Sequence, residues 1–218
     1  SDGIKLVQKP QLPNVDKIII LSATASKSVW QMVDEDIEFL ELSAPVKNKG
    51  TVIQYLDRNT SKGKLTPEVQ EEIVLEMRQQ GFNIFISYKH DKFFGEATGV
   101  DKQATFGATA GLDHMKGKDL AVVGTPNLTE ADYNLQAFAL SGNLPSRMAQ
   151  RNVEHNGFRF PLYTFEKGFY QDYQLYCIES EILQSVGRAR VKRTDANVVV
   201  LSHFPVEADE HWYEGQQL

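Results

Sequence analysis

The feature that most constrains the fold is a set of four short apolar runs spread along the chain. They cover residues 17–21 (KIIIL), 83–87 (NIFIS), 120–123 (LAVV) and 197–201 (NVVVL). Each run is continuous rather than alternating, which is typical of strands in a parallel sheet that is buried on both faces. Because helical segments lie between the runs, the pattern predicts βαβ units and a layered α/β fold with helices on both faces of a mainly parallel sheet.

Three segments have helical patterns. Residues 66–80 combine an N-cap threonine, a proline in the first turn, an apolar stripe and a following glycine as the C-terminal stop. Residues 129–140 begin with Thr129 and Asp132, a pair that resembles a capping box. A third helix is expected from about residue 169 to residue 188.

A β-hairpin is predicted between the last two of these helices. Asn156-Gly157 separates two short apolar-aromatic stretches, which is a signal for a two-residue hairpin turn. We expect Pro161 to limit the second strand, because proline cannot donate a backbone hydrogen bond. Residues 143–167 are accordingly interpreted as a β-hairpin insertion on the edge of the sheet.

The composition is that of an ordinary globular protein: 218 residues, 41% hydrophobic, with a formal net charge of −6. The net negative charge argues against a protein that binds nucleic acid over most of its surface, although it permits a local basic groove. Cys177 is the single cysteine, so a reducing compartment, the cytoplasm, is expected. No apolar run is long enough for a membrane span. Because no methionine precedes Ser1, we expect a piece of a longer protein.

The chain lacks the usual nucleotide-binding motifs. Residues 104–119 approach a phosphate-binding P-loop, but the spacing is one residue too long and Asp119 stands where Ser or Thr is required. A GxGxxG motif is also absent, and no His, Asp and Glu cluster has metal-ligand spacing. The chain is therefore not expected to bind a nucleotide or a metal ion by itself.

The basic stretch 184–193 (QSVGRARVKR) is the strongest candidate for chemistry. Cations at a helix C-terminus favour the helix dipole only slightly, and Gly187 costs about 1 kcal/mol relative to alanine inside a helix. A glycine at this position is expected if a ligand must approach the backbone closely, because glycine has no side chain. Arg188 and Arg190, whose planar guanidinium groups suit phosphate, could form a triphosphate lid together with Gln184.

Four short motifs follow one another along the chain. They are residues 22–24 (SAT), 83–89 (NIFISYK), 109–113 (TAGLD) and 184–190 (QSVGRAR). In this order, and at the ends of predicted strands, they resemble motifs III, IV, V and VI of superfamily 2 helicases of the DEAD/DEAH-like type. The residues around the third motif (FGATAGLDHMKGKDLAVVGTP) and the insertion before the fourth motif are similar to the corresponding segments of helicases carried by phages and mobile elements.

This resemblance implies a domain organisation. Residues 1–45 would be the tail of a first RecA-like domain, residues 46–218 a second, C-terminal RecA-like domain, and residues 45–50 the linker. ATP and Mg²⁺ would be bound mainly by the N-terminal RecA-like domain of the same protein, so this chain alone is expected to be inactive. Its other partner would be a nucleic acid, for which we favour DNA over RNA, and it would have no membrane partner.

The resemblance also implies roles for particular residues. The catalytic group would be Arg188, Arg190 and Gln184, with one of the two arginines acting as an arginine finger on the γ-phosphate. The nucleotide would contact Gly111, Asp113 and Gly187. The nucleic acid would contact Thr109, Ser87, Tyr88 and Lys89, while Ser22 and Thr24 would couple hydrolysis to domain movement. The commoner form of motif VI has its second arginine where Val191 stands, and we favour Arg190 over Arg193 as its equivalent.

Two other functions are compatible with the residues. The hairpin region interleaves basic and aromatic side chains, which could grip single strands in a stand-alone nucleic-acid-binding module. Its residues are Arg147, Arg151, Phe158, Arg159, Phe160, Tyr163, Phe165 and Lys167. The same aromatics could instead simply pack the hairpin onto the domain. A third possibility is the RecA-like part of a restriction or nuclease complex.

Overall fold

The computed structural model describes residues 8–9, 11–22, 24–42, 46–89, 94, 96, 104–108, 113–144, 147–213 and 216–217. The chain divides into two compact units. Unit 1 consists of residues 1–43, 127–152 and 161–177, and unit 2 consists of residues 44–126, 153–160 and 178–218.

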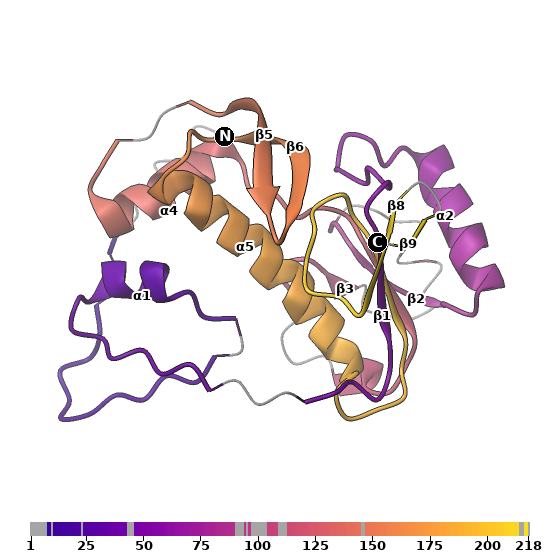
Figure 1. Cartoon of the computed structure of the whole chain (residues 1–218), viewed down its shortest axis with the longest axis horizontal. Coiled ribbons are helices and arrows are strands. Elements are labelled where there is room, and N and C mark those ends of the chain that lie inside the picture. The colour runs from indigo at the N-terminus through magenta and orange to yellow at the C-terminus, as the bar shows by residue number, and fades with distance from the viewer. Residues whose placement is uncertain are drawn as a thin grey trace. The chain divides into compact units, whose positions relative to one another are not determined.

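Unit 2 is built on a seven-stranded sheet with the order β3-β2-β4-β7-β1-β8-β9. Strands β1, β2, β3, β8 and β9 of this sheet are labelled in Figure 1. Every neighbouring pair is parallel except β8 and β9. The strands are β1 (Val52–Tyr55), β2 (Ile84–Ser87), β3 (Ala104–Thr105), β4 (Leu120–Val123), β7 (Val198–Leu201), β8 (Glu210–Tyr213) and β9 (Gln216–Gln217). The chain is thus an α/β protein with a mainly parallel sheet, as the apolar runs predict.

Three of the four predicted strands are confirmed. The runs at 83–87, 120–123 and 197–201 form β2, β4 and β7, and every residue of β4 and β7 is buried. The run at 17–21 was predicted to be a strand, and this prediction is wrong: it is not part of a strand, and Leu21 is 91% exposed. An apolar run becomes a strand only where a neighbour pairs with its backbone, and in the described part of the chain this run has no such neighbour.

Strand β1 is absent from the sequence prediction because Gln54 interrupts its apolar residues. Gln54 is fully buried in the middle of the sheet. Its amide nitrogen donates to the carbonyl oxygens of Ser202 (2.9 Å) and Phe204 (2.7 Å), and its oxygen accepts from the amide of Val206 (3.0 Å). The side chain therefore holds the loop after β7 against the sheet with its hydrogen bonds satisfied.

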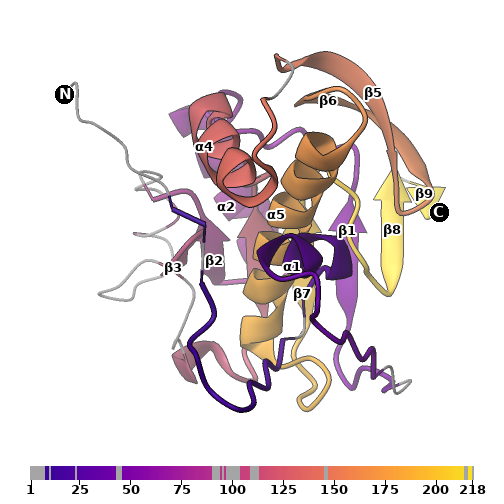
Figure 2. The same ribbon diagram turned by 90° about the vertical axis from the view of Figure 1, so that its left-hand side faces the viewer.

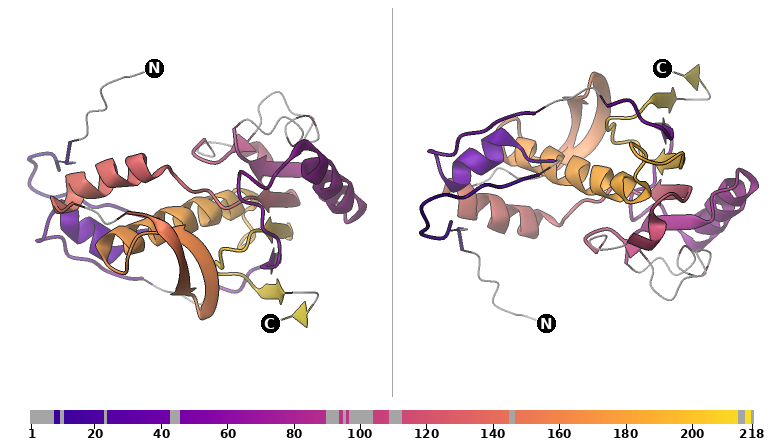
Figure 3. Two further views of the ribbon diagram at one scale, coloured as in Figure 1. Left: turned by 90° about the horizontal axis from the view of Figure 1, so that it is seen from above. Right: turned by 90° about the horizontal axis from the view of Figure 1, so that it is seen from below.

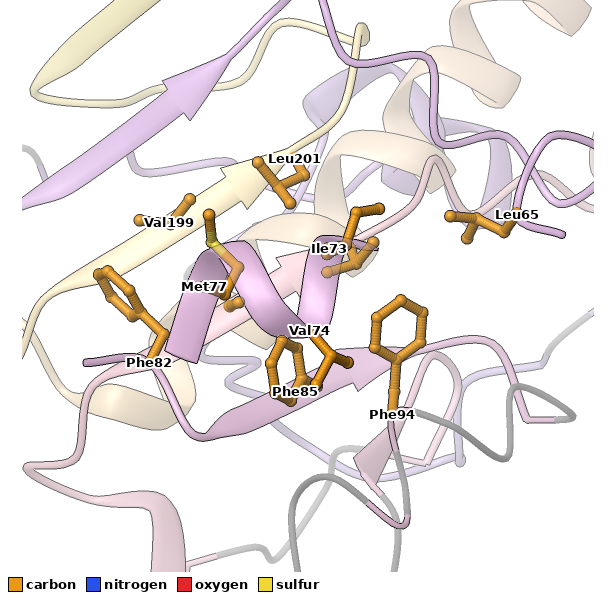
Figure 4. Close-up of a cluster of buried hydrophobic side chains, with 11 residues drawn as sticks. Leu65, Ile73, Val74, Met77, Phe82, Phe85, Phe94, Val199 and Leu201 are labelled. Carbon is orange, nitrogen blue, oxygen red and sulfur yellow. The ribbon is translucent and has the colours of Figure 1, made fainter. Parts of the chain in front are cut away.

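Helix α2 (Pro67–Gln79) covers one face of the sheet, and the predicted helix at 66–80 is confirmed. The Thr66 hydroxyl accepts a hydrogen bond from the Val69 amide, and Gly81 follows the helix with φ of +94°. Figure 4 shows the apolar side chains of α2 gathered with those of the sheet into one cluster. Its buried members are Leu65, Ile73, Val74, Met77, Phe82, Phe85, Phe94, Ala121, Val123, Val199 and Leu201.

The second half of α5 (Phe169–Val186) covers the other face, so that this part of the helix and α2 lie on opposite sides of the sheet (Figure 2). Ile178, Ile182 and Val186 on this half of the helix are buried. Val122 and Val200 are buried as well, although they alternate with the strand residues that belong to the α2 cluster. Both faces of the sheet are therefore covered.

Unit 1 contains α1 (Lys27–Val33), α4 (Glu130–Ser141) and the first half of α5. Helices α1 and α4 lie side by side in both views of Figure 3. The Thr129 hydroxyl caps α4 by accepting from the Asp132 amide (3.2 Å), and it also donates to the Asp132 carboxylate (2.7 Å). The buried core of the unit consists of Tyr133, Ala137, Met148, Phe165 and Tyr170.

The predicted hairpin is confirmed as a separate two-stranded sheet of β5 (Ala149–His155) and β6 (Phe158–Thr164). Both turn residues have positive φ, 49° at Asn156 and 80° at Gly157, as a type I′ turn requires. The expectation that Pro161 limits the second strand is wrong, because β6 continues through it to Thr164. Each strand of a two-stranded ribbon has one unpaired edge, and a proline there removes no ladder hydrogen bond.

The tip of the hairpin is fixed within unit 2 by Glu179 on α5. The Glu179 carboxylate accepts from Asn156 Nδ2 (2.7 Å) and lies 3.3 Å from His155 Nε2. Burial alone would raise the pKa of this carboxyl, but its contacts with His155 and Asn156 outweigh burial and hold the pKa below its usual range. The ionised carboxylate therefore stabilises the folded hairpin tip.

Replacing Glu179 by glutamine should lower the free energy of unfolding by about 1–2 kcal/mol near pH 7. Because the folded pKa is depressed, this contribution is present above the ordinary glutamate pKa and is lost as the pH falls through the folded value. The difference between wild type and E179Q in urea unfolding should therefore shrink from pH 7 to pH 4. Glu154→Gln, exposed on the same hairpin, is the control. A difference that does not change with pH would contradict the assignment.

Gly50 lies two residues before the start of β1, where a side chain has no room. A Cβ at this position would lie 1.8 Å from the carbonyl oxygen of Ala196. Gly50→Ala should therefore lower the free energy of unfolding by about 2 kcal/mol or more, since the backbone itself must shift. Gly63→Ala, where a Cβ would meet nothing within 4 Å, should be close to neutral in the same thermal or urea unfolding measurement. Equal stability of the two variants would contradict this account.

Candidate phosphate site at the amino edge of the sheet

Three loops meet at the amino edge of the sheet in unit 2. Residues 46–50, 113–119 and 187–195 precede β1, β4 and β7, and these strands are parallel neighbours in the order β4-β7-β1. The loops are joined by backbone hydrogen bonds: the Gly117 amide donates to the Ala189 carbonyl (3.0 Å), and the Lys49 and Gly50 amides donate to the Val191 carbonyl (3.0 Å each). The sheet therefore brings together segments that are far apart in the sequence.

The end of α5 places the two predicted arginines. The α-helix ends at Val186, a 3₁₀ turn η2 (Gly187–Ala189) follows, and Arg190 adopts the left-handed conformation with φ of 60°. The Arg190 amide donates to the Gly187 carbonyl (3.2 Å), and the Arg190 carbonyl in turn accepts from the Arg193 amide (2.7 Å). This double turn carries the chain from the helix into the strand and leaves Arg190 on the surface.

Arg190 forms an ion pair with Asp113, which begins the 3₁₀ helix η1 (Asp113–Met115). Arg190 Nη2 lies 3.7 Å from Asp113 Oδ1, and the two side chains are 47% and 85% exposed. Exposed pairs of this kind contribute between 0 and about 1 kcal/mol. The structure thus joins one residue of the TAGLD motif to one residue of the QSVGRAR motif through a weak contact.

Arg188 and Gly187 have features that the fold itself does not require. The Nε atom of Arg188 is buried and has no hydrogen-bond partner in the described part of the chain. Gly187 is exposed, its φ is not in the left-handed region, and a Cβ there would meet nothing within 4 Å. Gln184 is exposed one turn earlier, where its Nε2 donates to the Ser180 hydroxyl (3.2 Å).

The residues predicted to contact nucleic acid lie at the opposite, carboxyl edge. Ser87 ends β2, and its hydroxyl donates to the Val123 carbonyl (2.7 Å). The Tyr88 hydroxyl donates to the Thr125 carbonyl (2.8 Å) and accepts from the Thr125 amide (3.0 Å). Lys89 is exposed. Since a four-residue strand is about 10 Å long, this group does not meet the arginines.

Four predicted residues remain to be placed. Ser22 and Thr24 lie in unit 1, where the Thr24 amide donates to the Ser22 hydroxyl (3.3 Å). Thr109 and Gly111 lie outside the described residues. The roles assigned to all four residues stay predictions.

The carboxyl edge also holds a polar network that the sequence reasoning missed. The hydroxyls of Thr125 and Ser202 are 2.7 Å apart, and Nδ1 of His203 lies 3.4 Å from the Thr125 hydroxyl. Burial lowers the pKa of His203 below its usual range, which favours the neutral ring. These residues directly follow β4 and β7, so the rule that ligands bind beyond strand ends could have identified them.

Two of the four aromatics in the hairpin region are buried. Phe160 is 8% exposed and Phe165 is fully buried, whereas Tyr163 is 50% exposed. Arg151 contacts the Glu166 carboxylate at 3.4 Å. The interpretation that these aromatics pack the hairpin therefore holds for Phe160 and Phe165, and they cannot serve as a stacking platform in this conformation.

Among the residues that the structure describes, no group of three or more His, Cys, Asp or Glu side chains could hold a metal ion. Within the same residues, no helix has the length and apolar character needed to cross a bilayer. Comparisons of the chain with protein-family models, with curated proteins and with solved structures gave no significant match.

Proposed function

We propose that this chain is the C-terminal motor domain of an ATP-dependent nucleic-acid helicase or translocase. In this proposal ATP lies between this domain and an N-terminal RecA-like domain of the same protein. The chain supplies an arginine finger from the turn after α5. The observation that carries the proposal is the turn itself, which combines an unpartnered Arg188 Nε, an open Gly187 and the pair of Arg190 with Asp113.

The electrostatics of this turn suit a phosphate ligand. A buried guanidinium nitrogen without a partner loses about 1–3 kcal/mol relative to a hydrogen-bonded one, so an oxygen ligand supplied at Arg188 would be stabilising. The weak pair of Arg190 with Asp113 can be replaced by a phosphate, which carries more charge than a carboxylate. An arginine donated across a cleft stabilises the charge that develops on the γ-phosphate during transfer to water.

The described residues do not offer a complete site for Mg²⁺ and the triphosphate. No metal-binding group is present among them, and the sequence lacks a P-loop. In the proposal, Mg²⁺ and most of the ATP are therefore held by the N-terminal domain, and the ion supplies neutralisation of phosphate charge there. Arg188 and Arg190 act on that ATP from the other side.

The segment around α1 also supports an N-terminal partner domain. Residues 17–21 and 37–42 belong to no helix or strand and lie one on each side of α1. Leu21 and Leu42 are each 91% exposed. Apolar residues on both sides of a helix stay exposed to solvent unless another part of the protein covers them, and the proposal assigns that cover to the N-terminal RecA-like domain.

Substitution of either arginine should abolish nucleic-acid-stimulated ATP hydrolysis by the complete protein. Arg188→Ala and Arg190→Ala are each expected to lower kcat by about 10³-fold or more, because the developing phosphate charge loses its partner. Lys192→Ala removes one positive charge from the same loop and should change kcat less than about threefold. Near-normal turnover in both arginine variants, or an equal loss in the lysine variant, would contradict the proposed role.

Gly187→Ala separates a structural role of this glycine from a functional one. The substitution has room and does not require a left-handed backbone, so the free energy of unfolding should stay within about 0.5 kcal/mol of wild type or rise. If the γ-phosphate approaches this turn closely, the added methyl group should nevertheless reduce ATP hydrolysis by about tenfold or more. Unchanged hydrolysis together with unchanged stability would show that close approach to Gly187 is not required.

A further inference from the structure

The loops at the amino edge carry far more positive charge than the two arginines. Eight lysines and arginines stand in residues 46–50, 113–119 and 187–195. They are Lys47, Lys49, Lys116, Lys118, Arg188, Arg190, Lys192 and Arg193. All are exposed except Arg188, which is half-buried. We call this group the amino-edge basic surface.

Fewer carboxylates than cations stand at this edge. The three loops contain Asp113, Asp119 and Asp195, and Asp209 reaches the first loop by accepting two hydrogen bonds from Asn48 (2.9 Å each). Asp119 is occupied by the Asn197 amide (2.6 Å). The three loops therefore hold eight cations and three carboxylates, and Glu207, Asp209 and Glu210 stand in the loop before β8 or at its start, beside β1. Cations outnumber carboxylates here, whereas the whole chain has a formal net charge of −6.

The charges come together because of the sheet and not because of the sequence. β4, β7 and β1 are adjacent and parallel, so their first residues stand side by side about 4.8 Å apart and their preceding loops lie at the same edge. The backbone hydrogen bonds to the Ala189 and Val191 carbonyls hold the loops in this row. The result is a basic surface that is continuous over three strands.

We propose that the amino-edge basic surface binds the phosphodiester backbone of duplex nucleic acid. The eight cations are spread over three loops instead of converging on one point, as the few donors of a triphosphate site would. Duplex DNA, which carries one charge about every 1.7 Å along its axis, can contact such a spread of cations. The three loops contain no Phe, Tyr or Trp, so they offer no platform for stacking unpaired bases. Binding is therefore expected to depend on charge and not on base sequence. The affinity for a duplex should be at least as high as the affinity for a single strand.

This surface differs from the nucleic-acid site that the motif resemblance implies. Ser87, Tyr88 and Lys89 lie at the carboxyl edge, on the other side of the strands. The inference depends on the cations and the sheet topology, and it does not require that the protein hydrolyse ATP. A finding that the protein does not hydrolyse ATP would therefore not contradict the proposed binding of a duplex.

The test measures binding of the 218-residue chain to a fluorescent 20-base-pair DNA duplex by anisotropy, from about 50 to 200 mM salt. The test variant replaces Lys47, Lys49, Lys116 and Lys118 by alanine. These four lysines lie outside the proposed arginine site and are exposed, so folding should be preserved, which circular dichroism checks. The charge-matched control replaces four exposed lysines elsewhere: Lys17, Lys27, Lys62 and Lys64.

Removal of four phosphate contacts should weaken binding more than about tenfold at 50 mM salt. It should also reduce the slope of log K against log salt by about 3 to 4, whereas the control should keep both the affinity and the slope. Duplex RNA of the same sequence and the single strand are parallel arms that rank the nucleic acids. Mixed-sequence duplexes should bind equally well.

Three results would overturn the proposal. The first is no binding to any duplex at 50 mM salt. The second is an equal loss of affinity in the control variant, which would indicate binding elsewhere. The third is complete displacement of the duplex by stoichiometric ATP or inorganic triphosphate, which would make the surface a nucleotide site only.

Discussion

The parallel pairing of β2, β4, β7 and β1 is the constraint on which the rest of unit 2 depends. Residues of β4 and β7 are buried on both faces, so two helical layers must cover them, and α2 and the second half of α5 do so. Parallel strands also fix which loops meet. All loops that precede strands gather at one edge, and all loops that follow strands gather at the other.

That separation of loops shapes the candidate site. The turn after α5 and the loop before β4 precede neighbouring strands, so Arg190 and Asp113 come within 3.7 Å although 77 positions separate them in the chain. Ser87 ends β2 and Tyr88 follows it, and their hydroxyls donate to the Val123 and Thr125 carbonyls instead. The molecule therefore has two chemically distinct edges: a basic amino edge, and a carboxyl edge whose hydroxyls are hydrogen-bonded to one another and to the backbone.

The proposed motor function and the proposed duplex-binding surface both use the amino edge. The arginines lie on the turn after α5, while the lysines of the other two loops extend the positive charge across three strands. A nucleotide needs a few well-placed donors, whereas a nucleic-acid backbone is attracted by the number of cations and responds to salt. Hydrolysis and salt-dependent binding can thus be measured separately on the same edge.

The sequence by itself determined the local structure. Continuous apolar runs predicted β2, β4 and β7, the caps predicted α2 and α4, and Asn156-Gly157 predicted the hairpin turn, because these features depend on residues close in sequence. The same reasoning failed at residues 17–21, where no strand among the described residues pairs with the apolar run. It also failed at β1, because the buried side chain of Gln54 is hydrogen-bonded to a loop about 150 positions away. Only the tertiary structure decided that three loops share an edge, that Arg188 Nε is buried without a partner among the described residues, and that eight cations lie at one edge of the sheet. Strand order determines these proximities, and strand order depends on long-range pairing that no local pattern encodes.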